Sequence, residues 1–324
     1  MNESSPASNP DLVYSLYANG WKPQLVRIAL LLDVFTPLAN GPADAHTTAR
    51  ACGCDVCGIR TLLDYLSSLR LLERKGSTYA LSPTAAAFLV PRQPTYAGDW
   101  VLSWTDPEMW DGMLEALRGG RPSHPALPYA QDQWLESYRP WRPAKGLEMW
   151  RAAGIEPGRR PGLRVLDVAC GCAIKSLVLA QADPTVHVTC VDSPDVLEIA
   201  HNLAERLEVV SQVTFLPGDL HAIDLGDGRY DAALLGQITD ALTPEQNTGL
   251  FRRVYKALSV GGMLVIDVFM APEEPTEGSG ISTLLAWALH GGAAHPFTDY
   301  RRWLEDTGFR RVNHLSERWL SAIK

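Results

Sequence analysis

The feature that most limits how this chain can fold is its segment 165–173, which reads VLDVACGCA. An apolar run ends in an acidic residue, passes through a turn of small residues and leads into a helical pattern. Open α/β sheets use this strand–turn–helix arrangement to hold a nucleotide-like ligand at the carboxyl end of the first strand. The segment therefore predicts an α/β domain with a ligand site.

Two further acids follow strand-like runs in the same way. Asp192 closes the run 186–191, and Asp219 follows the run 213–218. From about residue 161 onward strands and helices alternate, which indicates a doubly wound, mostly parallel sheet. Because the carboxyl ends of parallel strands meet at one edge, the three acids describe one ligand cleft.

Three further signals mark helix ends in this half. Thr243-Pro244-Glu245-Gln246 predicts a capping box with proline at the first helical position. Gly261-Gly262 is expected to end that helix before a fifth strand at 263–268, and Gly308 is expected to end the last helix.

The bulk composition restricts the class of protein. A length of 324 residues predicts two domains, and the hydrophobic share of 46% is that of an ordinary soluble protein. The net charge of −8 counts against general nucleic-acid binding. No apolar run approaches the ~20 residues of a membrane span, and the first residues carry no secretory signal. We expect a cytoplasmic protein with no membrane partner.

Residues 11–90 read as a compact helical unit that carries a small hairpin. Apolar residues follow helical spacing around 25–32 and 62–69, and a two-stranded hairpin is expected over 71–81. Ser82 then caps a helix that begins at Pro83. Helices followed by such a hairpin form a winged-helix pattern.

Winged helices often bind DNA, but the basic residues that this requires are sparse here. The segment 58–72, in the place of a recognition helix, has only Arg60 and Arg70 as basic residues. A DNA reader should offer several phosphate contacts as well as base contacts. A dimerisation or packing role is therefore favoured, and a ligand-sensing regulator remains a third hypothesis.

Three cysteines lie close together at positions 52, 54 and 57. No second cysteine pair or nearby His-x-x-x-His completes a four-ligand set. We predict no metal site.

Residues 91–160 form a helical connector that is rich in tryptophan. Most of these side chains are expected in an interdomain core, while some can form an aromatic wall for a flat organic substrate. The candidates for that wall are Trp104, Trp134, Tyr138 and Trp141.

The turn after the first strand indicates what kind of ligand binds. It has a single glycine, whereas a pyrophosphate cradle has three, so a ligand without phosphate fits better. Asp192 is suited to accept both hydroxyls of a ribose, since a carboxylate has two acceptor oxygens. Asp219 is placed for an adenine amino group, and Leu220 can pack on the ring.

These residues resemble those of a known family. The carboxyl-terminal half resembles the class I S-adenosylmethionine (SAM)-dependent methyltransferases, which have a Rossmann-like fold. From about residue 12 to its end, the chain resembles the O-methyltransferases that add a winged-helix dimerisation domain to that fold. The resemblance rests on the order and spacing of LDVACG at 166–171, Val191-Asp192, Gly218-Asp219 and Gly261-Gly262.

The resemblance implies a domain plan and a cofactor. A dimerisation domain would span 1–95, a connector lining the substrate pocket 96–160, and a SAM-binding methyltransferase domain 161–324. The enzyme would be a homodimer that uses SAM, releases S-adenosylhomocysteine (SAH) and acts on a small molecule of secondary metabolism rather than on nucleic acid.

The resemblance also assigns residues to the cofactor. Asp167 and Gly171 would frame its methionine part, Asp192 would hold the ribose, and Asp219 with Leu220 the adenine. Gln237 would line both the cofactor and the substrate pocket. Ser193, which follows Asp192 at the start of a predicted helix, completes the predicted cofactor set.

The chain departs from the family pattern at two places. Ala169 and Ala173 replace glycines of the first motif. Alanine is tolerable there only where neither position needs a positive φ, which implies a slightly shifted cofactor pose. At Thr239 and Asp240 the chain lacks the histidine that serves as base in family members that methylate phenols.

The missing histidine leaves the catalytic base open. Asp240 can accept a phenolic proton only where burial raises its pKa well above ~4. His290 is the second candidate, whereas His295 is expected to cap a helix or face solvent. We predict methyl transfer to a small aromatic or heterocyclic metabolite, first to oxygen. A thiolate, enolate or amine acceptor remains open. So does a SAM-binding enzyme of another class, such as a decarboxylase, hydroxylase or cyclisation catalyst.

Overall fold

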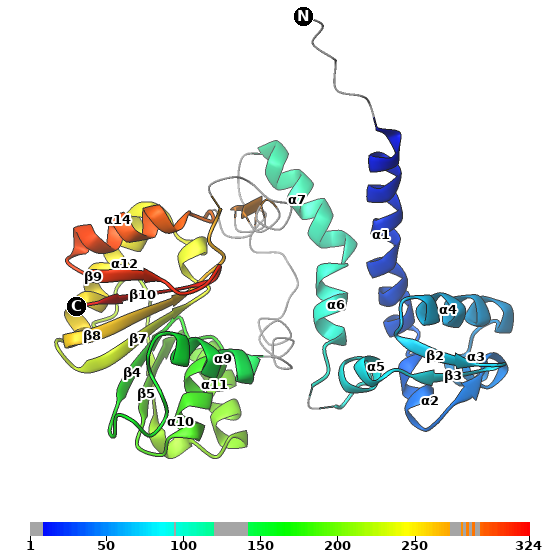
Figure 1. Ribbon diagram of the computed structural model, residues 1–324, viewed down its shortest axis with the longest axis horizontal. Coiled ribbons are helices and arrows are strands. Elements are labelled where there is room, and N and C mark those ends of the chain that lie inside the picture. Colours follow the sequence, from blue (N-terminus) through cyan, green and yellow to red (C-terminus); the bar gives the residue numbers. More distant parts are fainter. Residues whose placement is uncertain are drawn as a thin grey trace, which may run out of the picture. The chain divides into compact units, whose positions relative to one another are not determined.

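The structure is a computed structural model that describes residues 9–93, 95–119, 142–272, 280, 283–284, 287–288 and 292–324. By their contacts, the described residues up to Met109 form one compact unit and those from Trp110 on form a second (Figure 1). The three-part division at 95/96 and 160/161 stays a prediction.

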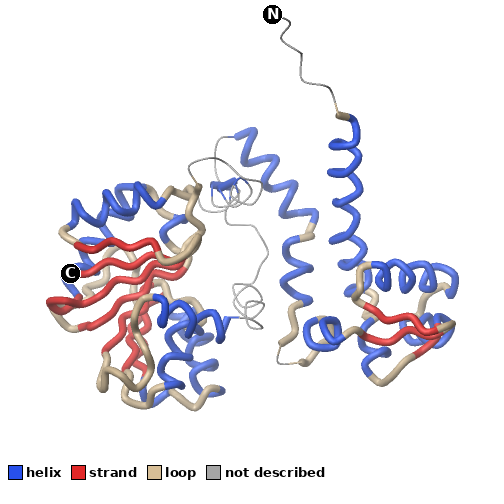
Figure 2. The backbone as a smooth tube through the Cα atoms, viewed as in Figure 1, coloured by secondary structure: helices blue, strands red, loops and turns tan. Residues whose placement is uncertain are grey.

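The amino-terminal unit is helical with one small sheet (Figure 2). The three strands lie in the order β1-β3-β2, with β2 and β3 forming the predicted hairpin. The hairpin is thus confirmed, whereas β1 was missed because two residues show no period. The elements are α1 (Pro10–Leu31), α2 (Phe35–Ala39), β1 (Ala43–Asp44), α3 (Ala45–Cys52), α4 (Val56–Ser68), β2 (Leu72–Lys75), β3 (Thr78–Leu81), α5 (Pro83–Phe88) and α6 (Gly98–Trp104).

Local caps explain where these helices begin. Asp55 accepts a hydrogen bond from the Gly58 N–H at the start of α4, and Ser82 accepts one from the Ala85 N–H at the start of α5. The predicted cap at Ser82 is therefore confirmed, with Pro83 in the first turn.

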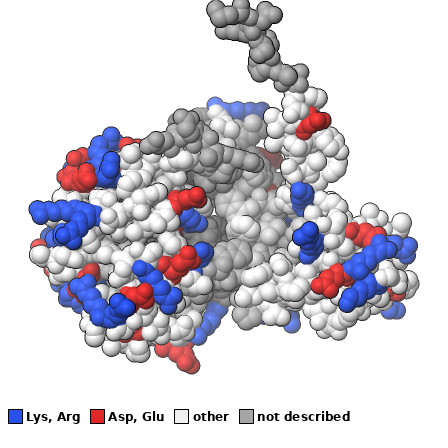
Figure 3. Space-filling model, in the orientation of Figure 1, with Lys and Arg blue, Asp and Glu red and all other residues white. Residues whose placement is uncertain are grey.

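The charge on the surface is mixed. Figure 3 shows acidic and basic side chains interspersed on the face in view, over both units. This pattern is typical of an ordinary solvated surface.

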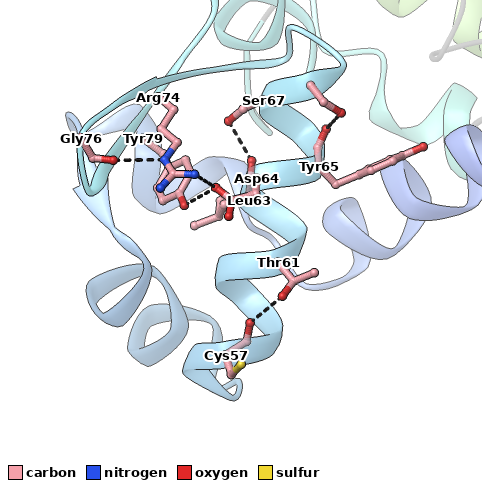
Figure 4. Close-up of polar contacts among 10 residues, drawn as sticks. Cys57, Thr61, Leu63, Asp64, Tyr65, Ser67, Arg74, Gly76 and Tyr79 are labelled. Atoms are coloured by element: carbon pink, nitrogen blue, oxygen red, sulfur yellow. Dashed lines mark hydrogen bonds and ion pairs between the residues drawn. The ribbon is translucent and has the colours of Figure 1, made fainter.

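The wing is tied to α4 through one carboxylate. Asp64 accepts hydrogen bonds from the Tyr79 hydroxyl at 2.6 Å and from Arg74 Nη1 at 2.7 Å. Figure 4 shows these side chains converging from the helix and both strands, with the Arg74 Nε also donating to the Gly76 carbonyl. The arginine of the wing is thus engaged within its own unit.

The second unit contains a seven-stranded sheet in the order β6-β5-β4-β7-β8-β10-β9. The first five strands in this order are parallel, while β10 runs antiparallel to both β8 and β9. This confirms the predicted doubly wound, mostly parallel sheet. The elements are α7 (Pro107–Gly119), which begins at the border of the units, α9 (Arg142–Ala152), β4 (Arg164–Val168), α10 (Ile174–Ala182), β5 (His187–Asp192), α11 (Pro194–Arg206), β6 (Val213–Pro217), β7 (Tyr230–Gly236), α12 (Pro244–Ala257), β8 (Leu258–Asp267), α14 (Phe297–Thr307), β9 (Arg310–His314) and β10 (Trp319–Ile323), with short 3₁₀ turns η1 (Val210–Gln212) and η2 (Thr239–Ala241).

Two helical layers cover the sheet (Figure 1). Alternate residues of each strand point to opposite faces. Val165 therefore packs with α9, α10 and α11, while its neighbour Leu166 packs with α12 and α14. Burial on both faces explains why the central strands read as continuous apolar runs.

The signals for helix ends in this unit are mostly confirmed. Thr243 and Gln246 form the predicted capping box of α12, and Gly308 ends α14 with a φ of 110°. Gly261-Gly262 was predicted to separate a helix from the fifth strand. Instead the pair lies inside β8, where the ladder with β7 shifts register and Gly261 has a φ of 75°. Glycine is common at such irregularities.

The structure gives no support for a metal site at the cysteines. Within the described part of the chain, no group of three His, Cys, Asp or Glu residues could hold a metal ion, and all six cysteines are free thiols. None of the helices described is long and apolar enough to span a membrane.

Candidate active site

The turn after β4 has an unusual backbone. Ala169, Gly171 and Ala173 have φ values of 53°, 56° and 54°. The expectation that the two alanines avoid positive φ is therefore wrong. The left-handed conformation costs a non-glycine residue about 1–2 kcal/mol, so the turn keeps a glycine-type shape at two strained positions. The carbonyl of Ala173 accepts hydrogen bonds from Ser176 and Leu177, which joins the turn to α10.

Asp167 connects the end of β4 to the first turn of α10. The Ser176 hydroxyl donates to Asp167 Oδ2 at 2.6 Å. The Asp167 side chain is almost fully buried, and this burial raises its pKa to about 7, although the Ser176 hydrogen bond and the charge of Lys175 oppose the shift.

Asp192 connects the turn to the end of β5. Its Oδ2 accepts the Gly171 N–H at 2.9 Å and its Oδ1 accepts the Ser193 N–H at 2.8 Å. Burial raises the pKa of Asp192, and the two backbone donors partly offset that effect. Each carboxylate oxygen keeps a further lone pair for a ligand.

Asp219 stands at the third strand end. The Gly218 N–H donates to the Asp192 carbonyl at 3.0 Å, which ties the segment after β6 to the end of β5. Asp219 Oδ1 accepts the His221 N–H at 2.8 Å, and Arg253 of α12 donates to the Leu220 carbonyl. Since β4, β5 and β6 are neighbours, the three predicted acids lie at adjacent strand ends.

A buried ion pair lies at the ends of β7 and β8. The Lys175 ammonium pairs with Asp267 Oδ2, and the two side chains are only 12% and 4% exposed. A Cβ at position 236 would stand 3.2 Å from Lys175 Nζ, so Gly236 leaves room for the ammonium. Sequence reasoning missed this pair. The available signal was Lys175 as the one charged residue in the mostly apolar helix α10.

Asp267 also pairs with a second cation. Arg318 Nη2 lies 3.3 Å from Asp267 Oδ1, and the guanidinium stacks 4.0 Å from the ring centroid of Phe269. Gln237 lies beside Asp267, because the Gln237 N–H donates to the Asp267 carbonyl at 2.7 Å. It has a positive φ of 59°.

Asp240 lies just after β7, in the turn η2. Burial raises its pKa; the Asp267 carboxylate adds to this shift and the Arg318 charge opposes it. The turn is held by its neighbour Thr239, whose hydroxyl is 2.9 Å from the Tyr300 hydroxyl and whose carbonyl accepts from Asn247. A Cβ at Gly292 would overlap the Asp240 carbonyl, so a glycine is needed against this turn.

His295, which was expected to cap a helix or face solvent, lies two residues before the start of α14 and is mostly buried. Its side chain is 15% exposed, and its Nδ1 lies 3.9 Å from Asp299 Oδ2. The ring packs edge-on against Trp303 with centroids 4.8 Å apart. Burial lowers the pKa of His295, opposed by the charges of Asp299 and Asp240. The ring is buried because the His295 carbonyl accepts the Ala271 N–H at 3.0 Å, which holds this loop against the segment after β8.

The remaining predicted residues are only partly described. Trp104 is half-buried at the end of α6, in the amino-terminal unit. His290, Trp134, Tyr138 and Trp141 lie outside the described residues.

Comparison with known proteins identifies the family. A family described as a methyltransferase domain matches residues 165–262, and the O-methyltransferase dimerisation domain matches residues 15–91. The chain is 30% identical over 301 residues to the tetracenomycin polyketide synthesis 8-O-methyl transferase of Streptomyces glaucescens, covering 88% of this chain and 86% of that one. The chain belongs to the SAM-dependent O-methyltransferase family.

Two further similarities agree with this. The methyltransferase is 28% identical over 316 residues to the 3-hydroxy-5-methyl-1-naphthoate 3-O-methyltransferase of Streptomyces sahachiroi, covering 94% of this chain and 90% of that one. Its fold matches human N-acetylserotonin methyltransferase in complex with SAM, with a TM-score of 0.81 at 20% identity over 100% of this chain and 99% of that one. The relatives methylate oxygen, nitrogen or carbon in small metabolites. The protein is thus a SAM-dependent methyltransferase of small metabolites, and methyl transfer is favoured over the decarboxylase, hydroxylase and cyclisation alternatives.

Proposed function

We propose that this methyltransferase methylates a hydroxyl group on a small aromatic metabolite. One observation carries the proposal: a buried carboxyl group with a raised pKa, Asp240, stands just after β7, where the family pattern has its histidine base. Two relatives support the acceptor class, since their names give a naphthoate 3-O-methyl and a tetracenomycin 8-O-methyl transfer.

The ends of β4, β5 and β6 suit SAM. Asp167 and Gly171 frame the methionine part, Asp192 and Ser193 the ribose, and Asp219 with Leu220 the adenine, while Gln237 lines the pocket. The fit is supported at Asp192, where each oxygen already holds one loop amide and keeps a lone pair for a ribose hydroxyl. Bound there, SAM supplies an electrophilic methyl group and leaves as SAH.

The protein then has to align the acceptor and remove its proton. Methyl transfer is an in-line displacement that depends mainly on holding the acceptor oxygen close and aligned. Asp240 takes the hydroxyl proton, and its raised pKa makes it a stronger base than an exposed carboxylate. His290 remains a second candidate base, and the wall of Trp104, Trp134, Tyr138 and Trp141 remains the predicted substrate contact.

The enzyme works as a homodimer. Helix α1 has 22 residues, of which only Ala29 is buried. Large apolar side chains on it are 47–69% exposed, namely Leu12, Val13, Tyr14, Leu16, Tyr17, Trp21 and Leu31. Apolar exposure on this scale is typical of a protein interface, and the dimerisation domain of the family covers residues 15–91. Light scattering on the purified chain should give twice the mass of 35.5 kDa.

A metabolite is the partner that the surface favours over nucleic acid, because basic and acidic side chains alternate on the face in view of Figure 3. The six free thiols fit a reducing compartment, so the cytoplasm is the proposed location.

Binding and product analysis test the proposed activity. Calorimetric titration of the purified protein with SAH should show saturable binding, and incubation with SAM and a hydroxynaphthalene should yield a methyl ether by mass spectrometry. Matched aminonaphthalene and thionaphthol acceptors serve as controls. Failure to bind either SAM or SAH would overturn the cofactor site, and methylation of the amine or thiol alone would overturn the hydroxyl acceptor.

A further inference from the structure

Arg318 stands at the same sheet edge as Asp240. It directly precedes β10, whose first residue pairs with Asp267 at the end of β8. Its carbonyl accepts the Val268 N–H at 2.9 Å. Because β10 runs antiparallel to β8, the beginning of β10 lies beside the carboxyl end of β8, which brings a residue from the end of the chain to the acceptor side of the site.

The guanidinium is oriented and also accessible. It stacks on Phe269, and Nη2 faces Asp267 at 3.3 Å, which together fix the plane of the group. Its Nε is buried and has no hydrogen-bond partner among the described residues. Nevertheless the Arg318 side chain is 38% exposed and Phe269 is 37% exposed. A planar guanidinium with a fixed orientation is suited to bind a carboxylate through two parallel N–H···O bonds.

Arg318 is also the cation of this group that a ligand can reach. Lys175 and Arg318 both face the carboxylate of Asp267. Lys175 and Asp267 are buried, whereas Arg318 is the most exposed of the three. Asp240 lies within electrostatic reach, since the Arg318 charge lowers its pKa against the effect of burial.

We propose that Arg318 anchors a carboxylate on the aromatic acceptor, so that the substrate is a hydroxyaryl carboxylic acid. The carboxylate binds the guanidinium, the ring lies along Phe269, and the hydroxyl is directed toward Asp240. This inference rests on the proposed hydroxyl methylation and names the substrate class of that same site. If Arg318 only held Asp267 in place, it would make no distinction between an acid and its neutral analogue.

Binding measurements on the SAH-loaded enzyme separate the two roles. The probes are 1-naphthoate and 1-naphthamide, which have nearly the same shape but differ in charge. Wild-type protein should bind the acid about tenfold more tightly than the amide. Arg318→Gln should remove that preference and leave amide binding unchanged, and Arg318→Lys should keep part of it because the ammonium retains the charge without the fork.

The control is Arg310→Gln, which removes the same charge at the other end of β10, where Arg310 pairs with Ile323. It should preserve the preference for the acid. SAH titration and a cooperative melt verify that each variant is folded. If Arg318→Gln does not fold, the ratio of acid to amide affinity is compared between wild-type protein and Arg318→Lys instead. A smaller ratio in Arg318→Lys then supports the anchor, and an unchanged ratio overturns it.

Equal binding of acid and amide by the wild type overturns the anchor, and so does a Gln variant that weakens both ligands alike. These binding results do not depend on methyl transfer. If 3-hydroxy-1-naphthoate binds with the expected preference but its hydroxyl is not methylated, the proposed activity fails while the anchor stands. With turnover present, Arg318→Gln should raise KM for the hydroxy acid about tenfold and change kcat much less.

Discussion

The candidate site lies along one edge of the sheet, and the two halves of that edge, at β4–β6 and at β7–β8, are built in different ways. At the ends of β4, β5 and β6, acids at or just after the strand ends accept hydrogen bonds from residues of the adjoining turns and helices, as Asp192 does from the Gly171 and Ser193 N–H groups. At the ends of β7 and β8, side chains from distant segments meet, as Lys175, Asp267 and Arg318 do. The half at β4, β5 and β6, proposed to bind the cofactor, is therefore local in sequence. The half at β7 and β8, proposed to bind the acceptor, depends on the sheet being assembled.

This difference fits the two tasks. The cofactor is the same throughout the family, and the half proposed to hold it is built largely from backbone N–H groups and strand-end acids. The acceptor differs between relatives, which methylate oxygen, nitrogen or carbon. Side chains brought together by tertiary structure can be exchanged without altering the cofactor half. Four predictions test this separation, from the largest effect to the smallest.

Asp240→Asn should abolish most turnover and leave the cofactor half intact. Loss of a positioned base costs about 10²–10⁴-fold in rate, so kcat should fall about a thousandfold. The affinity for SAH, measured by calorimetry, should stay within a factor of about two. In the wild type kcat should rise with pH through the raised pKa of Asp240, because only the ionised carboxylate accepts a proton. A variant with unchanged kcat would show that the base is another group.

Lys175→Met should lower the free energy of unfolding, because Lys175 links the two halves. It belongs to α10, which follows the turn after β4, and its ammonium pairs with Asp267 at the end of β8. Removing one partner of a buried pair costs about 3 kcal/mol or more, measured by urea unfolding. The control is Lys145→Met, whose pair with Glu148 is more than half exposed. That pair should contribute well under about 1 kcal/mol. Equal losses in the two variants would refute a special role for Lys175.

The pKa of Asp167 predicts a stability change with pH. Burial raises this pKa from 3.8 to about 7 in the folded protein. The folded state thus binds a proton that the unfolded state has released, and the resulting stability is complete below the unfolded pKa and is lost as pH rises through the folded value. Between about pH 5 and pH 7, Asp167 should account for a loss of about 2 kcal/mol. Asp167→Asn should remove this dependence; an unchanged pH profile of the unfolding free energy would contradict it.

Ala169→Gly should stabilise the protein slightly. Ala169 has a φ of 53°, which glycine adopts without the Cβ penalty, and the expected gain is about 1 kcal/mol. Ala182→Gly, at an exposed helical position in α10, should instead destabilise by up to about 1 kcal/mol. Thermal melts of both variants check the contrast, and a destabilising Ala169→Gly would show that the turn is not strained.

The sequence predicted where the three strand-end acids lie. Asp167, Asp192 and Asp219 follow apolar runs of strand length, and the parallel order brings those ends to one edge. It also predicted the wing, the cap at Ser82 and the capping box of α12, because each depends on residues close in the chain.

In the proposed acceptor half, the sequence singled out Asp240, Gln237, His290 and the aromatic wall, but it missed the ion pairs around Asp267. The roles of Lys175, Asp267 and Arg318 have no signature in spacing, since they meet only when β10 pairs with β8 and α10 packs on the sheet. His295 was expected to cap a helix or face solvent; it lies just before α14, and the Ala271 hydrogen bond and the Trp303 ring bury it. Its burial is a consequence of a loop contact between segments that are separate in sequence.

The sequence by itself determined the α/β class, the order of the strand-end acids and hence the kind of cofactor, because strand, turn and helix signals are local. Tertiary structure alone decided that Ala169 and Ala173 adopt positive φ, since the turn must reach both Asp192 and α10. It also decided that two cations share Asp267. A buried charge is tolerated only with partners in place, and those partners come from strands and helices that the chain brings together only on folding.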